Sequence, residues 1–242
     1  MRRAVRRAAV AVGQVVLPPL CPLCRVGDPG DGVGFCSTCT PGLERLSEPF
    51  CTVCALPFGG AGPSHPCARC HREPPPFEAA RAWGPYAGGL LQSVQRLKYG
   101  QDLALRRALV GLFVEAYDRF ELPEPQAVVP VPCHRRALRR RGFDLPALLS
   151  RGLCRRRSLV WRPRALARAG PEVDLVGLGA AARARAVAGA FRPRERLAGD
   201  VLLVDDVITT TATARACARA CLAAGARRVH VLALARTARA HP

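Results

Sequence analysis

VLLVDDVITTTATARACA, residues 201–218, joins three kinds of sequence in one order. An unbroken apolar run ends in two carboxylates, Asp205 and Asp206, and a threonine-rich turn leads into an alanine-rich segment. The apolar run predicts a strand that is buried on both faces, as in a parallel sheet. The alanine-rich segment predicts a helix that stops at Gly225, and residues 227–235 predict the returning strand. This βαβ unit predicts an α/β fold with a mainly parallel, doubly wound sheet.

The turn of this unit lies where ligands bind in open α/β sheets, beyond the carboxyl end of a strand. A helix start offers unpaired N–H groups and a partial positive charge, which suit a phosphate. Carboxylates repel a phosphate, but they accept hydrogen bonds from ribose hydroxyls. The turn therefore predicts a ligand with a phosphate at one end and a ribose at the other, such as phosphoribosyl pyrophosphate. The side chains that add hydroxyl donors are Thr209, Thr210, Thr211 and Thr213.

Eight of the twelve cysteines form four Cys-x-x-Cys pairs before residue 71. Two such pairs can direct four sulfurs at one tetrahedral ion, so the eight predict two structural Zn2+ sites. Segments of 11, 11 and 12 residues separate the pairs and do not decide the pairing; neighbouring pairs are favoured, as stacked zinc ribbons. A disulfide framework is the alternative, and it needs an oxidising compartment. The predicted ligands are Cys21, Cys24, Cys36, Cys39, Cys51, Cys54, Cys67 and Cys70.

The chain carries a formal net charge of +19, and Lys98 is the one lysine among its 37 basic residues. This charge predicts attraction to nucleic acid; the alternative is that a biased genome places arginines on solvated faces. A lysine retained among arginines indicates a geometric need for a compact ammonium, with chance as the alternative.

The first 20 residues carry four arginines ahead of a short apolar run. The run is too short to span a bilayer and lacks the small-residue cleavage site of a signal peptide. We therefore expect a leading helix over residues 1–20, stopped by Pro18 and Pro19, in a cytoplasmic protein without a membrane span.

Three prolines at residues 74–76 separate the cysteine-rich part from the rest, because they forbid a helix. We predict a small double zinc ribbon over residues 21–74 and a second domain over 75–242. In the second domain, apolar spacing predicts two helices joined near Gly100. The other expected elements are a strand over 127–131, a helix within 145–156, an extended segment around Val160 and an Ala/Arg helix near 180–187.

An arginine cluster follows the expected strand over 127–131. Its side chains suit a phosphate or pyrophosphate, and a solvated helix face is the alternative. The cluster consists of Arg135, Arg136, Arg139, Arg140 and Arg141.

Several segments, taken in order along the chain, resemble the ComF family. The resemblance covers nearly the whole chain and implies a double zinc ribbon before a type I phosphoribosyltransferase-like domain. Some members of this family serve DNA uptake during natural competence. The segments are the Cys-x-x-Cys pairs after VLPPLC, RLKYG (96–100), VPVPCHRRALRRRGFD (129–144), GLGAAARARAVAGAF (177–191) and VLLVDDVITTTAT (201–213).

The resemblance assigns roles to single residues. It implies that the acidic pair binds the ribose, that the threonine loop holds the 5-phosphate, and that two basic residues face the pyrophosphate. The catalytic set predicted in this way is Asp205, Asp206, Lys98 and Arg141. The ligand-binding set is Asp205, Asp206, Val207, Ile208, Thr209, Thr210, Thr211, Ala212 and Thr213.

The chain departs from the family pattern at four places. At Thr211 the family has a glycine, which permits positive φ and a close backbone approach that threonine resists. Either the β-branched residue is held at such an angle, at a cost of roughly 1 to 3 kcal/mol, or the loop shifts; in both cases we expect phosphate binding to survive in weakened form. The other departures are Asp144–Leu145 for the usual Asn-Gln, Leu175 after Asp174, and Ala186 in place of asparagine.

Two classes of function follow. The first is a phosphoribosyltransferase-like protein that binds phosphoribosyl pyrophosphate or ribose 5-phosphate with Mg2+. An active member of this class, a glycosyltransferase, would transfer the phosphoribosyl group to a nitrogen nucleophile and release pyrophosphate, and no residue stands out as a general base. The second is a non-catalytic DNA-binding or DNA-uptake accessory protein of competence, with single-stranded DNA and DNA-processing proteins as partners.

Overall fold

The computed structural model describes residues 20–29, 34–169 and 189–238. The predicted leading helix over 1–20 lies outside the described residues except for Leu20, and so does the Ala/Arg helix near 180–187. The family departures at Leu175 and Ala186 also lie outside them. Within the described ranges, no helix is long and apolar enough to cross a membrane.

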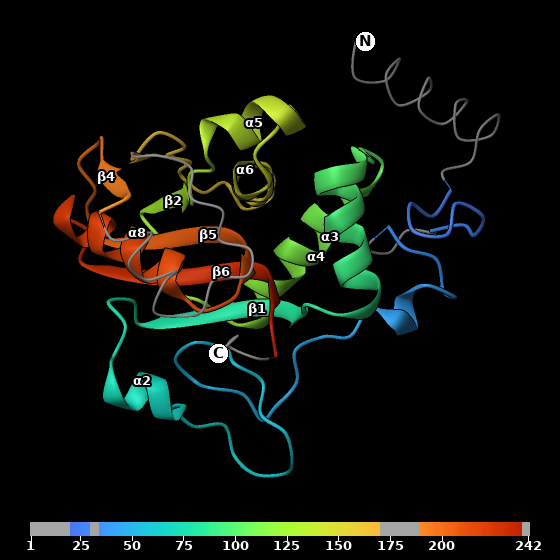
Figure 1. Cartoon of the computed structure of the whole chain (residues 1–242), viewed down its shortest axis with the longest axis horizontal. Coiled ribbons are helices and arrows are strands. Elements are labelled where there is room, and N and C mark those ends of the chain that lie inside the picture. Colours follow the sequence, from blue (N-terminus) through green and yellow to red (C-terminus); the bar gives the residue numbers. More distant parts are fainter. Residues whose placement is uncertain (1–19, 30–33, 170–188, 239–242) are drawn as a thin grey trace.

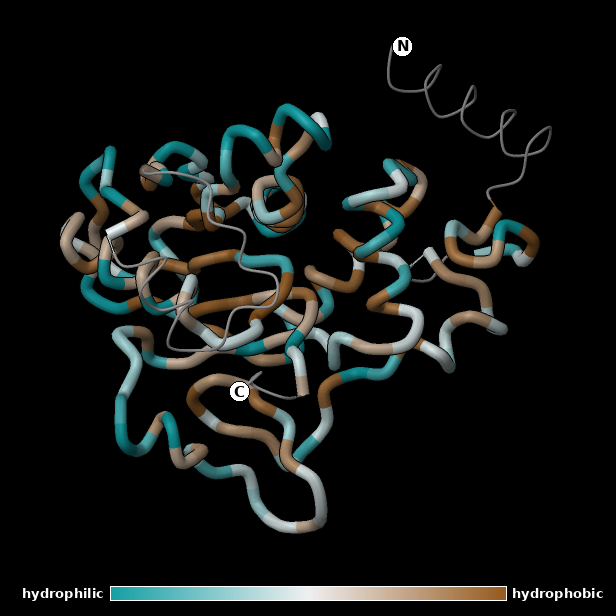
Figure 2. The backbone as a smooth tube through the Cα atoms, in the orientation of Figure 1, coloured by the Kyte–Doolittle hydropathy of each residue, from teal (hydrophilic) through white to brown (hydrophobic). Residues whose placement is uncertain are grey.

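A parallel four-stranded sheet forms the centre of the protein, in the order β1-β6-β5-β2 (Figure 1). Figure 2 shows that hydrophobic residues are concentrated along the two middle strands. This is the burial that their unbroken apolar runs predicted, and the parallel pairing confirms the expected fold class. The strands are β1 (Ala79–Pro85), β2 (Ala127–Pro130), β5 (Asp200–Ile208) and β6 (Arg228–Arg236).

Helices cover both faces of the sheet, so the fold is doubly wound. Leu202 and Val204 of β5 pack into one core with α3 (Gly88–Gly100), α4 (Leu105–Arg119) and α6 (Leu145–Arg157). Val201 and Leu203 point to the opposite face, where they pack with α8 (Ala212–Ala223). The period-two alternation along β5 therefore supplies two cores. Beside α8 lies a small antiparallel pair, β3 (Leu166–Arg168) and β4 (Phe191–Pro193).

The elements expected between residues 86 and 161 are confirmed. The helix α3 ends at Gly100, and Gln101 turns the chain with a left-handed φ of 52° before α4. After β2 comes a short basic helix, α5 (Arg135–Arg141). The segment near Val160 is extended and forms a parallel bridge from Trp161 to Val128.

The cysteine-rich part contains η1 (Thr40–Gly42) and α2 (Ala68–Arg72) and packs against the α/β part along much of its length. Cys21 and Cys36 belong to the same core as α3 and α4. Further along, the carbonyl of Val53 accepts a hydrogen bond from the Ala80 N–H of β1 at 2.7 Å. In Figure 1, α2 lies beyond the β1 edge of the sheet.

Candidate functional site

The threonine turn, residues 209–211, connects the end of β5 to the start of α8. Asp205 and Asp206 lie near the end of β5, where its pairing with β2 has ended and its pairing with β6 continues. Thr210 and Thr211 are buried, and the Thr211 carbonyl accepts the first helical hydrogen bond from Arg215 N at 2.8 Å. The turn is therefore a fixed part of the fold at the carboxyl end of a central strand, which is where open α/β sheets bind ligands.

The single lysine of the chain meets the acidic pair. Lys98 lies in the last turn of α3, and its Nζ is 2.6 Å from Asp206 Oδ2. The two side chains are only 13% and 14% exposed, so this ion pair is largely withdrawn from water. Burial by itself would lower the pKa of Lys98, but the Asp206 carboxylate more than offsets it, and the pKa lies above its ordinary value. Lys98 is therefore fully charged at neutral pH.

Asp205 is the buried member of the acidic pair, with 8% exposure. Its Oδ1 accepts a hydrogen bond from Asp206 N at 2.8 Å. Burial raises the pKa of Asp205 to about 7, and the Asp206 charge adds to this, while the Lys98 charge opposes it. Near neutral pH this carboxyl group therefore exists both as an acceptor and as a protonated donor.

Ionisation of Asp205 is expected to cost folding stability. Its folded pKa of about 7 exceeds the ordinary 3.8, so the contribution is complete at low pH and is lost as pH rises through 7. The free energy of unfolding should fall by about 1 kcal/mol between about pH 6 and about pH 8 through this group. Urea denaturation of the parent and Asp205→Asn across this range measures it. A fall of the same size in both proteins would contradict the assignment.

Thr211 has a backbone conformation that glycine adopts readily and that threonine resists. Its φ is 62° and its ψ is −1°, in the left-handed region. Of the two outcomes expected from the sequence, a strained residue or a shifted loop, the structure has the strained residue. A β-branched side chain is costly in this region, because Cβ crowds the neighbouring carbonyl oxygen.

Replacing Thr211 by glycine should therefore stabilise the protein. We expect Thr211→Gly to raise the free energy of unfolding by about 1 kcal/mol, measured by urea denaturation. Thr211→Ala is the matched control, because it removes the hydroxyl and keeps a Cβ at positive φ. Equal stability of the glycine and alanine variants would show that the left-handed backbone carries no penalty here.

Arg141 ends α5 and lies close to Lys98. Its guanidinium carbon is 5.1 Å from the centroid of the Tyr99 ring, at the end of α3. Its positive charge lowers the pKa of Lys98, against the larger effect of Asp206. Among the described residues, its buried Nε has no hydrogen-bond partner. The structure thus brings together Arg141, Lys98 and the acidic pair from three separate elements.

The other predicted residues fall into two groups. Ile208 and Ala212 are buried in the core under α8, and Val207 packs partly on the opposite core, so these three offer only backbone groups to a ligand. Four arginines of the cluster before Arg141 do not join the site; they lie exposed along α5: Arg135, Arg136, Arg139 and Arg140.

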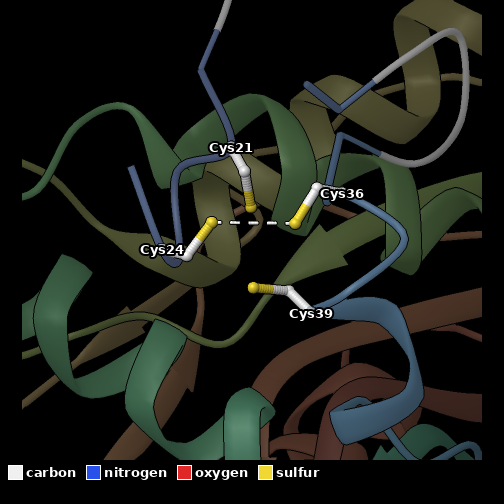
Figure 3. A group of neighbouring side chains, drawn as sticks. All are labelled: Cys21, Cys24, Cys36 and Cys39. Atoms are coloured by element: carbon white, nitrogen blue, oxygen red, sulfur yellow. Dashed lines mark hydrogen bonds between the residues drawn. The ribbon is translucent and has the colours of Figure 1, made fainter. Parts of the chain in front are cut away.

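The eight cysteines gather in two groups, each made of neighbouring pairs, which confirms the favoured pairing. Within each group the four sulfurs lie within 4.8 Å of one another. Figure 3 shows the four sulfurs of one group directed at a common centre. The first cysteine group is Cys21, Cys24, Cys36 and Cys39, and the second cysteine group is Cys51, Cys54, Cys67 and Cys70.

The donor chemistry of both groups fits structural zinc. Four sulfur ligands in a closed cluster form the usual set for a tetrahedral Zn2+ ion. Backbone N–H groups also point at sulfurs: Gly27 donates to Cys24 at 3.4 Å, and Cys67 donates to Cys51 at 3.2 Å. The Gly27 N–H lowers the pKa of the Cys24 thiol to about 6. Such donors favour the thiolate, which is the form that binds metal.

Two structural roles were missed in the sequence. Asp144, seen there only as a departure from the family, caps α6 by accepting from Ala147 N at 3.4 Å. Three arginines hold the threonine turn from outside, as described below: Arg69, Arg215 and Arg236. For Arg236 the sequence did contain an indication, because it directly follows the apolar run of a predicted buried strand. A buried arginine at such a position needs hydrogen-bond partners.

Comparison with known proteins agrees with this arrangement. A double zinc ribbon domain model matches residues 12–71. DNA utilization protein YhgH of Salmonella typhi is 33% identical over 229 residues, covering 92% of this chain and 99% of that protein. The protein of the same name from Escherichia coli K12 has the same identity and coverage. Competence protein F of Haemophilus influenzae is 27% identical over 215 residues, covering 84% and 90%. The chain therefore belongs to the ComF family, together with these YhgH proteins and Competence protein F.

Proposed function

We propose that this chain binds phosphoribosyl pyrophosphate or ribose 5-phosphate with Mg2+ at the carboxyl end of β5, and transfers the phosphoribosyl group to a nitrogen nucleophile. One observation carries the proposal. Lys98 Nζ lies 2.6 Å from Asp206 Oδ2, directly before a turn whose third threonine has the φ of a glycine, 62°. A basic group, an acidic pair and a glycine-like phosphate loop thus meet at one strand end.

Each group suits one part of such a ligand. The acidic pair offers carboxylate oxygens to the ribose hydroxyls. The turn offers backbone N–H groups and threonine hydroxyls to the 5-phosphate at the start of α8. Lys98 and Arg141 supply positive charge for the pyrophosphate, and Mg2+, when bound with the ligand, would neutralise charge on the leaving group. Transfer from phosphoribosyl pyrophosphate forms the bond from nitrogen to ribose C1 and breaks the C1–O bond. Pyrophosphate leaves, and the proton of the nitrogen passes to solvent.

Isothermal titration calorimetry with phosphoribosyl pyrophosphate and Mg2+ tests the binding. We expect Asp206→Asn to lose at least about tenfold in affinity, because it removes the charge that pairs with Lys98 and faces the ribose. Asp118→Asn is the matched control, since Asp118 forms an exposed pair with Arg157 far along the sequence. An absence of heat with folded, zinc-loaded parent protein would overturn the proposal.

A second candidate function is binding of single-stranded DNA on the α5 surface. The helix α5 carries five arginines and no acidic residue in its sequence RRALRRR. Next to it, Tyr99 is 63% exposed, and Arg141 packs over its ring. An exposed aromatic ring among arginines suits stacking on bases and contact with phosphates. The printed names of the relatives, DNA utilization protein and Competence protein F, favour a role connected with DNA.

Fluorescence anisotropy with a labelled single-stranded oligonucleotide separates the two candidates. DNA binding at α5 should weaken steeply with salt, with a slope reduced by about 0.7 for each phosphate contact removed. Tyr99→Ala and Arg139→Gln should weaken it, while Asp206→Asn should leave it unchanged. If low salt gives no binding, the DNA candidate fails without affecting the phosphoribosyl candidate.

A further inference from the structure

Every residue of the threonine turn is held by an arginine that contacts the cysteine-rich part of the chain. These contacts join the loop proposed to hold a phosphate to the second cysteine group, although more than a hundred residues separate them in sequence. No sequence motif shows them, because each arginine joins the turn to a cysteine-rich segment that is distant in sequence.

Arg236 makes the most direct of these connections. It ends β6 and is 2% exposed. Its Nε donates to the carbonyl of Cys54 at 3.0 Å, and its Nη2 lies 3.9 Å from the Cys54 sulfur. Its Nη1 donates to the carbonyl of Ile208 at 3.2 Å and also to that of Thr209. One buried guanidinium therefore binds both a predicted zinc ligand and the first residue of the turn.

Arg69 and Arg215 hold the next two residues. Arg69 lies in α2 between the ligands Cys67 and Cys70, and its Nη1 donates to the carbonyl of Thr210 at 2.9 Å. Arg215, in the first turn of α8, donates from Nε to Thr211 Oγ1 at 3.3 Å. The same guanidinium donates from Nη2 to the carbonyl of Glu73, which follows α2, at 2.5 Å. The three threonines are thus tied one by one to the second cysteine group and the segment after it.

The first cysteine group contacts a different element. Leu23 lies between the ligands Cys21 and Cys24, and its carbonyl accepts a hydrogen bond at 2.6 Å from Nη1 of Arg96, a residue of α3. Arg96 also pairs with Asp102 at 2.6 Å, which in turn pairs with Arg25 of the cysteine loop at 2.8 Å. In the described part of the chain, the hydrogen bonds from the cysteine-rich part to the threonine turn come from the side of the second group.

We propose that zinc bound by the second cysteine group positions the threonine turn through Arg236, Arg69 and Arg215. The metal fixes the Cys51–Cys54 and Cys67–Cys70 segments, and these fix the guanidinium groups that bind the carbonyls of Thr209 and Thr210 and the hydroxyl of Thr211. A zinc ion with four thiolates has a net negative charge, so it also stabilises the buried Arg236. The carbonyls of Thr209 and Thr210 are then bound to guanidinium groups, and the N–H groups at the start of α8 stay available to an anion. Loss of this zinc loosens the phosphate loop, whereas loss of the other zinc does not.

Hydrogen–deuterium exchange of the full chain tests the positioning without any ligand. The paired variants are Cys54→Ser/Cys70→Ser and Cys24→Ser/Cys39→Ser, each expected to lose one zinc per chain by elemental analysis. We expect the first pair to speed amide exchange at residues 209–213 at least about tenfold more than the second pair does, because the second pair changes only the general stability of the fold and no bond to the turn. Equal exchange rates of the turn in both double variants would overturn the proposal.

A variant that keeps all zinc ligands distinguishes loss of positioning from unfolding of the protein. Arg69→Met removes one bond to the turn and no zinc ligand, and Arg72→Met is its control on the same helix, where Arg72 is exposed. Arg69→Met should retain two zinc ions and still speed exchange at residues 209–213. Arg69→Lys should restore the parent rate, because a lysine ammonium can make the same single hydrogen bond. If Arg69→Met matches Arg72→Met, the connection through α2 does not exist.

The expected effect on ligand binding rests on the proposed function. Calorimetry together with the exchange measurements distinguishes a failure of the positioning from a failure of the proposed function. With phosphoribosyl pyrophosphate and Mg2+ in calorimetry, Arg69→Met should bind about tenfold more weakly than Arg72→Met. If the parent does not bind this ligand and the exchange results hold, the zinc-dependent positioning stands and the proposed function fails. If the parent binds and Arg69→Met neither binds more weakly nor exchanges faster, the proposed function stands and the positioning fails.

Discussion

Removing both zinc ions is expected to abolish the cooperative unfolding transition of this protein. A structural zinc contributes on the order of 10 kcal/mol to a fold of this kind, which is comparable to the whole stability of a typical domain. The effect should not stay within the cysteine-rich part, since Cys21 and Cys36 share a core with α3 and α4. A thermal melt followed by circular dichroism, with the zinc content measured on the same sample, gives the result.

The controls for this prediction follow from the different burial of the two groups. All four ligands of the second group are buried, whereas Cys24 of the first is exposed. Cys51→Ser should therefore lower the melting temperature more than Cys24→Ser. Added Zn2+ should restore the transition of the chelated parent, and added Mg2+ should not. An unchanged melt from protein that has lost its zinc would contradict a structural role for the metal.

The sequence predicted most reliably those features of the fold and the site whose structure depends on neighbouring residues. An apolar strand, two carboxylates and an alanine-rich helix are enough to predict β5, the turn and α8, because strand burial and helix start are properties of neighbouring residues. The Cys-x-x-Cys pairs predicted the zinc groups for the same reason. The pairing between groups needed the structure, since nearly equal spacers leave both schemes open.

The contacts between distant segments could not be predicted. The bonds of Arg236 to Cys54 span 182 positions in sequence, and an arginine-rich chain offers many equivalent donors. Thr211 is an informative case, because the sequence identified the missing glycine and left open whether the backbone would move. The structure shows that Thr211 has a positive φ of 62°, within a turn that arginines hold on every residue. Tertiary hydrogen bonds thus explain how a residue of poor local propensity is tolerated.

Replacing Lys98 by methionine should both destabilise the protein and remove ligand binding. The pair with Asp206 is mostly buried, and removing one partner leaves a carboxylate beside a second carboxyl group without its cation. We expect a loss of about 3 kcal/mol in the free energy of unfolding, toward the low end for a buried pair because some exposure remains. Arg107→Met is the control, since Arg107 is exposed on α4. Urea denaturation and calorimetry with phosphoribosyl pyrophosphate and Mg2+ measure the two effects.

Lys98→Arg separates charge from geometry at the same position. It keeps the positive charge, but a planar guanidinium is larger than the ammonium that fits 2.6 Å from Asp206 Oδ2 with 13% exposure. We expect an intermediate stability and a binding loss close to that of Lys98→Met, because the charge that is proposed to face the pyrophosphate is displaced. In a double-mutant cycle, Lys98→Met should cost much less in the Asp206→Asn background than in the parent. If arginine supports full binding, the compact ammonium is not required, and the single lysine of an arginine-rich chain is there by chance.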